Sequence, residues 1–170
     1  MESSSPSKAF SDFLSFFPKA TLPLTIQHDD HHHFSKSNDA LPDELLQDFI
    51  IPNLDFEIDE FTEFLPCLQF ESTHGMHHVV LWTARLMHYS FYVMNFSAQG
   101  LFLDMAEIAG FYSDNDKLIQ MMAHVDAEGN LFLVEGNLNE IHNELSPDKT
   151  KKWQLEILPD GLFQTIAIKL

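Results

Sequence analysis

"HVVLWTARLMHYSFYVMNFSAQGLFLDMAEI", residues 78–108, is the stretch that decides the fold class. It contains three runs rich in β-branched and aromatic residues, at 78–84, 89–96 and 101–108. Runs of this composition are typical of β-strands, whereas amphipathic helices show a longer apolar period. The polar sequence SAQG, which ends in Gly100, predicts a tight turn between the last two runs. Because short turns join antiparallel neighbours, this stretch predicts a strand meander.

The same pattern extends from residue 64 to residue 170. Gly129 and Gly161 repeat the place of Gly100, each after a polar pair and before an apolar run. In PDG the proline fixes φ and the glycine accepts a positive φ, which predicts a hairpin. We therefore predict a mainly β fold with minor helix: an antiparallel meander of about eight strands, curled or folded over. The predicted strands are CLQFES, HVVLWTA, YSFYVMNF, LFLDMAEI, KLIQMMAHV, NLFLVEG, KWQLEIL and LFQTIAIKL.

Residues 10–63 lack the strand pattern that begins at residue 64, and we predict a helical or irregular part there. FSDFLSFFP has Phe10, Phe13 and Phe17 at helical spacing and ends in a proline. LPDELLQDFIIP begins with a proline and two acids, which suit the first turn of a helix. These segments predict one or two short N-terminal helices. ATLPLTI contains Pro23 and predicts an edge or irregular extended segment, and HDDHHH with FSKSND predicts a polar loop.

The length of 170 residues suits one domain with a sizeable core. An apolar content of 45% favours a folded globule over a disordered chain. Residues 1–9 are rich in serine and proline, and we predict a disordered tail there. Residues 10–170 then form a single domain, with the meander at 64–170.

The formal charge of −17 is the strongest compositional feature. Between Lys36 and Lys117 the only cationic side chain is Arg85. Such a field repels nucleic-acid phosphates and anionic membranes, so we expect neither partner. Acidity serves either solubility or the docking of a basic protein partner, which it would attract from a distance. No segment resembles a secretory signal or a membrane span, and we expect a cytoplasmic location.

Three segments resemble a loose group of uncharacterised bacterial β-rich proteins. They are FFPKATLPLTI, LPDELLQDFI and FYVMNFSAQGLFLDMAEIAGFYSDNDKLIQMMAHVDAEGNLFLVEG. In that group a Phe-Pro…Leu-Pro segment precedes strands with a repeated strand–turn–Gly–strand pattern. The resemblance covers most of residues 13–135 and consists of turn and core residues. It implies a β-meander, and it implies no activity and no site residues.

The run HDDHHH raises the question of a transition-metal site. His28, His31 and His33 are possible ligands for zinc or nickel, with Asp29 or Asp30 as further donors. A fixed site needs ligands that converge from a rigid scaffold, which consecutive loop residues do not supply alone. The alternative is a solvated loop that captures zinc or nickel adventitiously. We expect no resident cofactor.

His74, His77 and His78 flank the predicted turn STHG and form a second histidine group. Successive strand residues point to opposite faces, so at most one of His77 and His78 can join His74. A metal-dependent enzyme would then need a carboxylate from another strand. The alternative is that these histidines lie on a turn and a strand surface without a metal.

Signatures of known enzyme classes are missing, and the sequence predicts no catalytic residue. Cys67 is the only cysteine, so a cysteine-based zinc cage or an internal disulfide is excluded. DFEIDEFTEFLP spaces its carboxylates like a calcium loop, but Glu60 stands where that loop needs glycine and Pro66 where it needs glutamate. The same stretch is equally compatible with a helix, because Leu54, Ile58, Phe61 and Leu65 would share one face.

The aromatic side chains suggest a pocket or a core. Tyr89, Phe91 and Tyr92 could line an apolar cavity for a small ligand, or they could fill the interior. Three hypotheses follow. The first is an interaction module, of the inhibitor or immunity type, that binds a basic protein through an acidic surface. The second is a ligand-binding β domain, and the third is a metal-dependent enzyme that uses His74 with His77 or His78.

Overall fold

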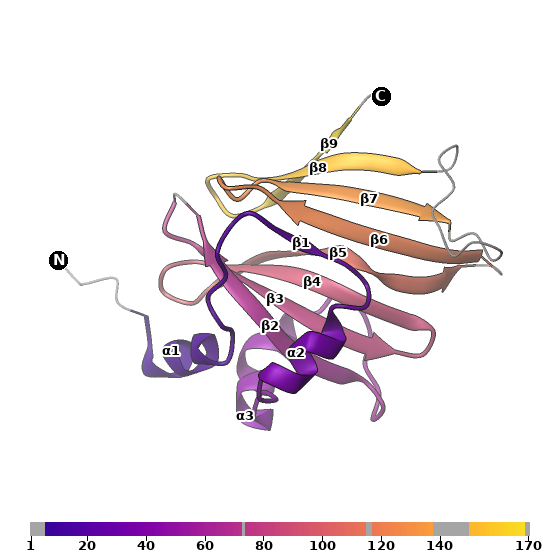
Figure 1. Cartoon of the computed structure of the whole chain (residues 1–170). Coiled ribbons are helices and arrows are strands. Elements are labelled where there is room, and N and C mark those ends of the chain that lie inside the picture. The colour runs from indigo at the N-terminus through magenta and orange to yellow at the C-terminus, as the bar shows by residue number, and fades with distance from the viewer. Residues whose placement is uncertain (1–5, 73, 115–116, 138–149, 169–170) are drawn as a thin grey trace.

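A computed structural model describes residues 6–72, 74–114, 117–137 and 150–168 (Figure 1). The fold is mainly β, as predicted: eight strands, β2 to β9, follow one another in a single antiparallel meander. A ninth strand, β1, pairs with β6. The glycines of three predicted turns, Gly100, Gly129 and Gly161, have positive φ angles of 98°, 88° and 87°. No helix in the described ranges is long and apolar enough to cross a membrane.

The elements have the following bounds. The helical segments are α1 (Lys8–Ser15), α2 (His31–Ser37), α3 (Asp43–Leu45), a π-helical turn (Leu46–Ile50) and a 3-10 turn (Ile51–Asn53). The strands are β1 (Leu24–Ile26), β2 (Glu63–Glu71), β3 (His77–Arg85), β4 (His88–Phe96), β5 (Phe102–Asp114), β6 (Lys117–Val125), β7 (Leu131–Asn137), β8 (Lys151–Ile157) and β9 (Phe163–Ala167).

The long strand β5 belongs to both halves of the sheet. It pairs with β4 from Phe102 to Tyr112, but with β6 only from Gly110 onward. Where β5 has left β6, β1 takes its place beside Ala123 to Val125. The sheet therefore folds over along β5. In Figure 1, β6–β9 lie above β5 and β2–β4 lie below it, and we call these two groups of strands the two layers. Gly110 lies at the point of departure, with a φ of 150° and its Cα against the backbone of β4.

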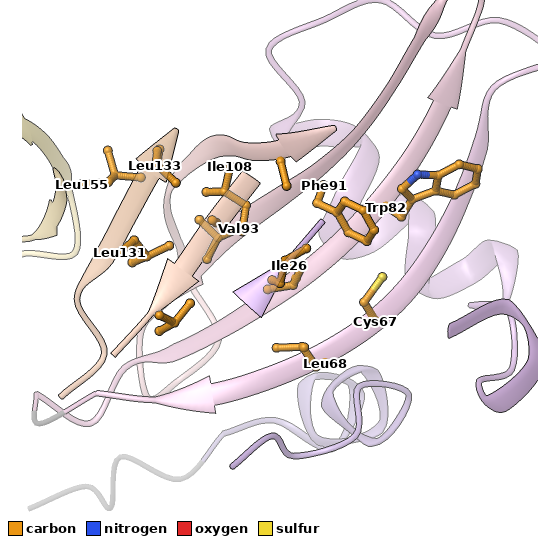
Figure 2. Packing of buried hydrophobic residues seen from close by; sticks show 14 of the residues in the cluster. Ile26, Cys67, Leu68, Trp82, Phe91, Val93, Ile108, Leu131, Leu133 and Leu155 are labelled. Atoms are coloured by element: carbon orange, nitrogen blue, oxygen red, sulfur yellow. The ribbon is translucent and has the colours of Figure 1, made fainter. Parts of the chain in front are cut away.

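Two cores lie on opposite faces of β3 and β4. The inner core fills the space between the two layers and draws on β1 to β8 (Figure 2). The outer core lies under α1 and the π-helical turn, where phenylalanines of α1 pack on β3 and β4. Both faces of β3 and β4 are thus covered, which explains why these strands carry apolar residues on both faces. Inner-core residues are Ile26, Cys67, Leu68, Phe70, Val80, Trp82, Ala84, Phe91, Val93, Ile108, Ala109, Ala123, Val125, Leu131, Leu133 and Leu155. Outer-core residues are Phe10, Phe13, Phe17, Leu41, Ile50, Val79, Leu81, Met94 and Phe96.

The two edges of the sheet differ. The β2 edge is covered, because Gln69 exchanges backbone hydrogen bonds with Pro18 and Ala20. Further along β2, the Asn38 side chain donates hydrogen bonds to the carbonyl oxygens of Pro66 and Cys67. The other edge is β9, which ends the strand order and is largely exposed (Figure 1).

A buried polar chain joins β3 and β4 to the β8–β9 turn. Asn95 donates from Nδ2 to the carbonyl oxygen of Gly161, at 2.8 Å. Its Oδ1 is then the acceptor, so His78 donates from Nδ1 across 2.6 Å. Beside this chain, the Asp104 carboxylate accepts a hydrogen bond from the backbone N–H of Phe163, at 2.9 Å. These contacts hold the last hairpin against the start of β5.

Protonation of His78 is expected to lower the free energy of unfolding. Burial lowers the pKa of His78, so the folded state resists a proton that the unfolded state takes up below about pH 6.5. The contribution of His78 to the free energy of unfolding is fully present above about pH 6.5. Below that pH it falls by at most about 1.4 kcal/mol per pH unit. Urea unfolding between about pH 7.5 and 5.5 measures the effect. A His78→Gln variant, which cannot titrate, is the control, and parallel pH profiles for the two proteins would contradict the assignment.

One local prediction was wrong, and one open alternative is decided. HDDHHH and FSKSND do not form a polar loop, because His31–Ser37 is the helix α2. This helix is held by tertiary contacts, with Phe34 edge-on to Phe91 and His31 stacked on Trp82. DFEIDEFTEFLP does not form a helix: residues 54–62 are irregular and lead into β2. The predicted tail of residues 1–9 lies partly outside the described residues, and Lys8 already belongs to α1.

Candidate docking surface

The structure separates the histidines at the start of β3. His74 lies exposed in the β2–β3 turn. The His77 ring contacts Phe10 of α1, with 5.6 Å between ring centroids. His78 points to the opposite face and contacts Phe70 at 5.0 Å. The side chains of His77 and His78 therefore lie on opposite faces of the sheet and cannot share a ligand.

The second histidine group lies at the other end of β3. It comprises His28, His31 and His33. His31 is stacked on Trp82 at 4.5 Å, and burial lowers its pKa. Trp82 is about 17 Å along β3 from His77, so the two groups do not meet. Within the described ranges, no three His, Cys, Asp or Glu side chains are grouped so that they could hold a metal ion.

Tyr89, Phe91 and Tyr92 do not face one space. Phe91 is completely buried in the inner core, where it contacts Phe34. Tyr92 points to the other face of β4, and Tyr89 is 42% exposed at the start of that strand. Of the three, only Tyr89 reaches an open hollow.

A polar network on the Tyr92 face joins β3, β4 and β5. The Glu107 carboxylate accepts hydrogen bonds from His88 Nε2 (2.7 Å) and from the Tyr92 hydroxyl (3.0 Å). Burial acts to raise the pKa of Glu107, but the hydrogen bond and charge of His88 outweigh it, and the pKa lies below its usual value. Burial, and next the charge of Glu107, raise the pKa of Tyr92. The network thus holds an ionised carboxylate beside a neutral phenol.

Arg85 connects this network to the segment before β2. Its Nη2 donates a hydrogen bond to the Tyr92 hydroxyl at 3.0 Å, and its Cζ lies 3.8 Å from the centroid of the Phe56 ring. Phe56 also contacts the Tyr92 ring, with a centroid distance of 5.3 Å. The guanidinium therefore anchors Phe56.

An open hollow of about 520 Å³ lies where this segment meets the turn between β3 and β4. Glu63, Ala84 and Tyr89 form one row across β2, β3 and β4 and line one side of the hollow. We call it the docking hollow. Its lining residues are Asp59, Phe61, Glu63, Ala84, Arg85, Leu86 and Tyr89.

Large apolar side chains are unusually exposed around the docking hollow. Phe61 is 78% exposed and Leu86 is 90% exposed. The neighbouring Met87 in the same turn is also exposed. Single exposed apolar residues are common in soluble proteins, whereas a group around one concavity is typical of a binding site.

The rim of the docking hollow is negatively charged. Asp59 and Glu63 are exposed, and Asp59 also accepts a hydrogen bond from the Phe61 backbone, which fixes the turn. Arg85 is the only cation that lines the hollow, and it is engaged by Tyr92 and Phe56. The hollow therefore combines exposed apolar groups with the exposed carboxylates of Asp59 and Glu63.

Sequence reasoning missed Phe61, Leu86 and Met87. One signal could have found the last two: the β3–β4 turn has leucine and methionine where hairpin turns favour Asn, Asp or Gly. Met87 even adopts a positive φ of 58°. Phe61 carries no such signal, because only the fold brings it beside this turn.

Comparisons with protein-family models, with curated proteins and with solved structures find no match to this chain.

Proposed function

We propose that the protein is an interaction module that binds a basic protein partner at the docking hollow. The observation that carries this proposal is the joint exposure of Phe61, Leu86 and Tyr89 around one acid-rimmed concavity. Binding energy at protein interfaces concentrates in apolar and aromatic anchors with a polar rim. An inhibitor or immunity-type protein is the class that such a module fits.

Charge selects the partner. The chain has a formal charge of −17, and two of its carboxylates, Asp59 and Glu63, lie at the docking hollow itself. A lysine or arginine beside an apolar side chain would place its charge at these carboxylates while the apolar group fills the hollow. Opposite fields also accelerate encounter, so association is expected to slow as salt rises.

Serine in place of Leu86 or Phe61 is expected to weaken peptide binding at least about tenfold, because each removes an exposed apolar anchor. The probe is a fluorescein-labelled peptide that alternates lysine with phenylalanine, and fluorescence anisotropy measures the affinity. Leu101→Ser is the matched control, since Leu101 is 69% exposed but lies in the β4–β5 turn, outside the docking hollow. All three variants should keep the wild-type unfolding free energy within about 0.5 kcal/mol.

The outcomes separate the two parts of the proposal. If Leu101→Ser weakens binding as much as Leu86→Ser, the docking hollow is not the site. A second peptide with glutamate in place of lysine tests the charge. If it binds equally well, or if Glu63→Gln leaves the salt dependence unchanged, the basic character of the partner is contradicted.

A further inference from the structure

The open edge of the sheet, β9, is unusually free of protection. Native edge strands are normally blocked by charges, prolines, bulges or a covering segment. The β9 strand, Phe163–Ala167, contains no charged residue and no proline. Ile166 and Ile168 are 39% and 38% exposed beside it. The β2 edge of the same sheet is covered, so the exposure of β9 is specific to this edge.

The backbone of β9 offers hydrogen bonds at two residues. The β8–β9 turn closes with a bond from Leu158 to Leu162, and Ile168 donates to Lys152, so even-numbered residues of β9 face β8. The odd-numbered residues therefore point their N–H and C=O groups outward. Phe163 already donates to the Asp104 carboxylate. Thr165 and Ala167 are left with outward-facing groups, and among the described residues no strand pairs with them.

Asp104 sets the register that an added strand can take. Because Phe163 is engaged, the available pair is Thr165 with Ala167. A two-fold axis through Ile166 would match Thr165 of one copy with Ala167 of the other, and the reverse. Both outward-facing residues of each copy are then used. Ile166 faces its own counterpart at a non-hydrogen-bonded position, where side chains are closest.

Charge complementarity favours a second copy of this chain as the occupant. Lys151 and Lys152 begin β8 at one end of the edge, and Glu156 and Asp160 lie toward the other end. Antiparallel pairing about a two-fold axis brings the basic end of each copy to the acidic end of the other. The two copies thus avoid like-charge contact at this edge, although the whole chain is strongly acidic.

We propose that the chain forms a two-fold dimer by antiparallel pairing of β9 with β9, with Ile166 on the axis. The sheet then runs continuously through both copies. The docking hollow lies at the β3–β4 turn, far along the strand order from β9. A dimer of this kind would therefore present two docking hollows without covering either.

Disulfide trapping tests the register. In the proposed pairing the two Ile166 Cα atoms lie about 4.5–5.5 Å apart, within the range that a disulfide bridges. Oxidation of Ile166→Cys should give a covalent dimer, read by non-reducing electrophoresis over a concentration series. Gln164→Cys is the matched control on the same face, because its two copies would lie about 13 Å apart. Cys67 does not compete, since it is 1% exposed and burial raises its pKa.

A proline at Thr165 separates backbone pairing from chance collision. Thr165→Pro removes an outward N–H and leaves the bonds to β8, so it should abolish trapping of Ile166→Cys; circular dichroism checks that this variant folds. Ile166→Lys, followed by analytical ultracentrifugation, should give a monomer where the wild type shows a concentration-dependent dimer. Equal trapping of both cysteine variants, trapping of neither, or trapping that survives Thr165→Pro would overturn the proposal.

Discussion

A Gly110→Ala substitution is expected to lower the free energy of unfolding by about 3–5 kcal/mol or to prevent folding. Gly110 has a φ of 150°, a conformation that residues with a side chain rarely adopt. An added Cβ would also collide with the backbone oxygen of Tyr89 and would lie 2.8 Å from the Cα of Ser90. These are backbone atoms of β4, so relief requires β4 and β5 to move apart. Urea unfolding followed by circular dichroism measures the loss.

Gly129→Ala is the matched control for this experiment. Gly129 has a φ of 88°, but no atom lies within 4 Å of the place its Cβ would take. Its substitution should cost about 1 kcal/mol, from the backbone conformation alone. The difference between the two variants then measures the contact between β5 and β4. Equal losses would show that Gly110 is not required by that contact.

An Asn95→Leu substitution is expected to lower the free energy of unfolding by about 3–5 kcal/mol, because it leaves two buried groups without partners. Asn95 is completely buried between His78 and the carbonyl oxygen of Gly161. Leucine has a similar size but neither donates nor accepts. Hydrogen exchange should also show faster exchange of the Gly161 and Phe163 amides, because the β8–β9 turn loses its attachment to β4.

A double-mutant cycle with His78→Leu isolates the contact. Each single variant leaves a polar partner unpaired, whereas the double variant removes both His78 and Asn95. The two losses should therefore sum to more than the loss in the double variant, by about 1–3 kcal/mol. Additive losses would mean that the hydrogen bond from His78 to Asn95 does not stabilise the fold.

The strand part of the fold could be read from the sequence because its rules are local. Runs rich in β-branched and aromatic residues mark the strands, and Gly100, Gly129 and Gly161 mark turns that need a positive φ. The fold-over at Gly110 could not be read in this way. It depends on β5 pairing with β4 over one length and with β6 over another, and both partners lie elsewhere in the chain.

The wrong prediction at α2 and the open alternative at residues 54–62 both concern segments that contact the rest of the protein. The helix α2 has no fully buried residue, and its first turn is three histidines, so its own sequence favours a loop. Stacking of His31 on Trp82 and contact of Phe34 with Phe91 stabilise it. Residues 54–62 have helical spacing but are irregular, and within them Phe56 packs against the Arg85 guanidinium.

The docking hollow could not be predicted from the sequence, because it also depends on contacts between distant segments. Its walls come from the segment before β2, from β3 and from β4, and their contact follows from strand pairing rather than from spacing in the chain. The sequence did supply the charge that surrounds it. The net charge could therefore be read from the sequence, whereas the apolar centre of the docking hollow could not.

The difference between the two edges of the sheet limits how many copies of the chain can join by strand pairing. A sheet with two open edges can add copies at both ends without limit, which is how fibrils grow. Pro18, Ala20 and Asn38 close the β2 edge, so of the two strands that end the described sheet only β9 has a free edge. Pairing through β9 consumes that edge in both copies at once. In the proposed dimer, strand addition would then end at two copies, because the segment around Pro18 covers the β2 edge, where a third copy would have to pair.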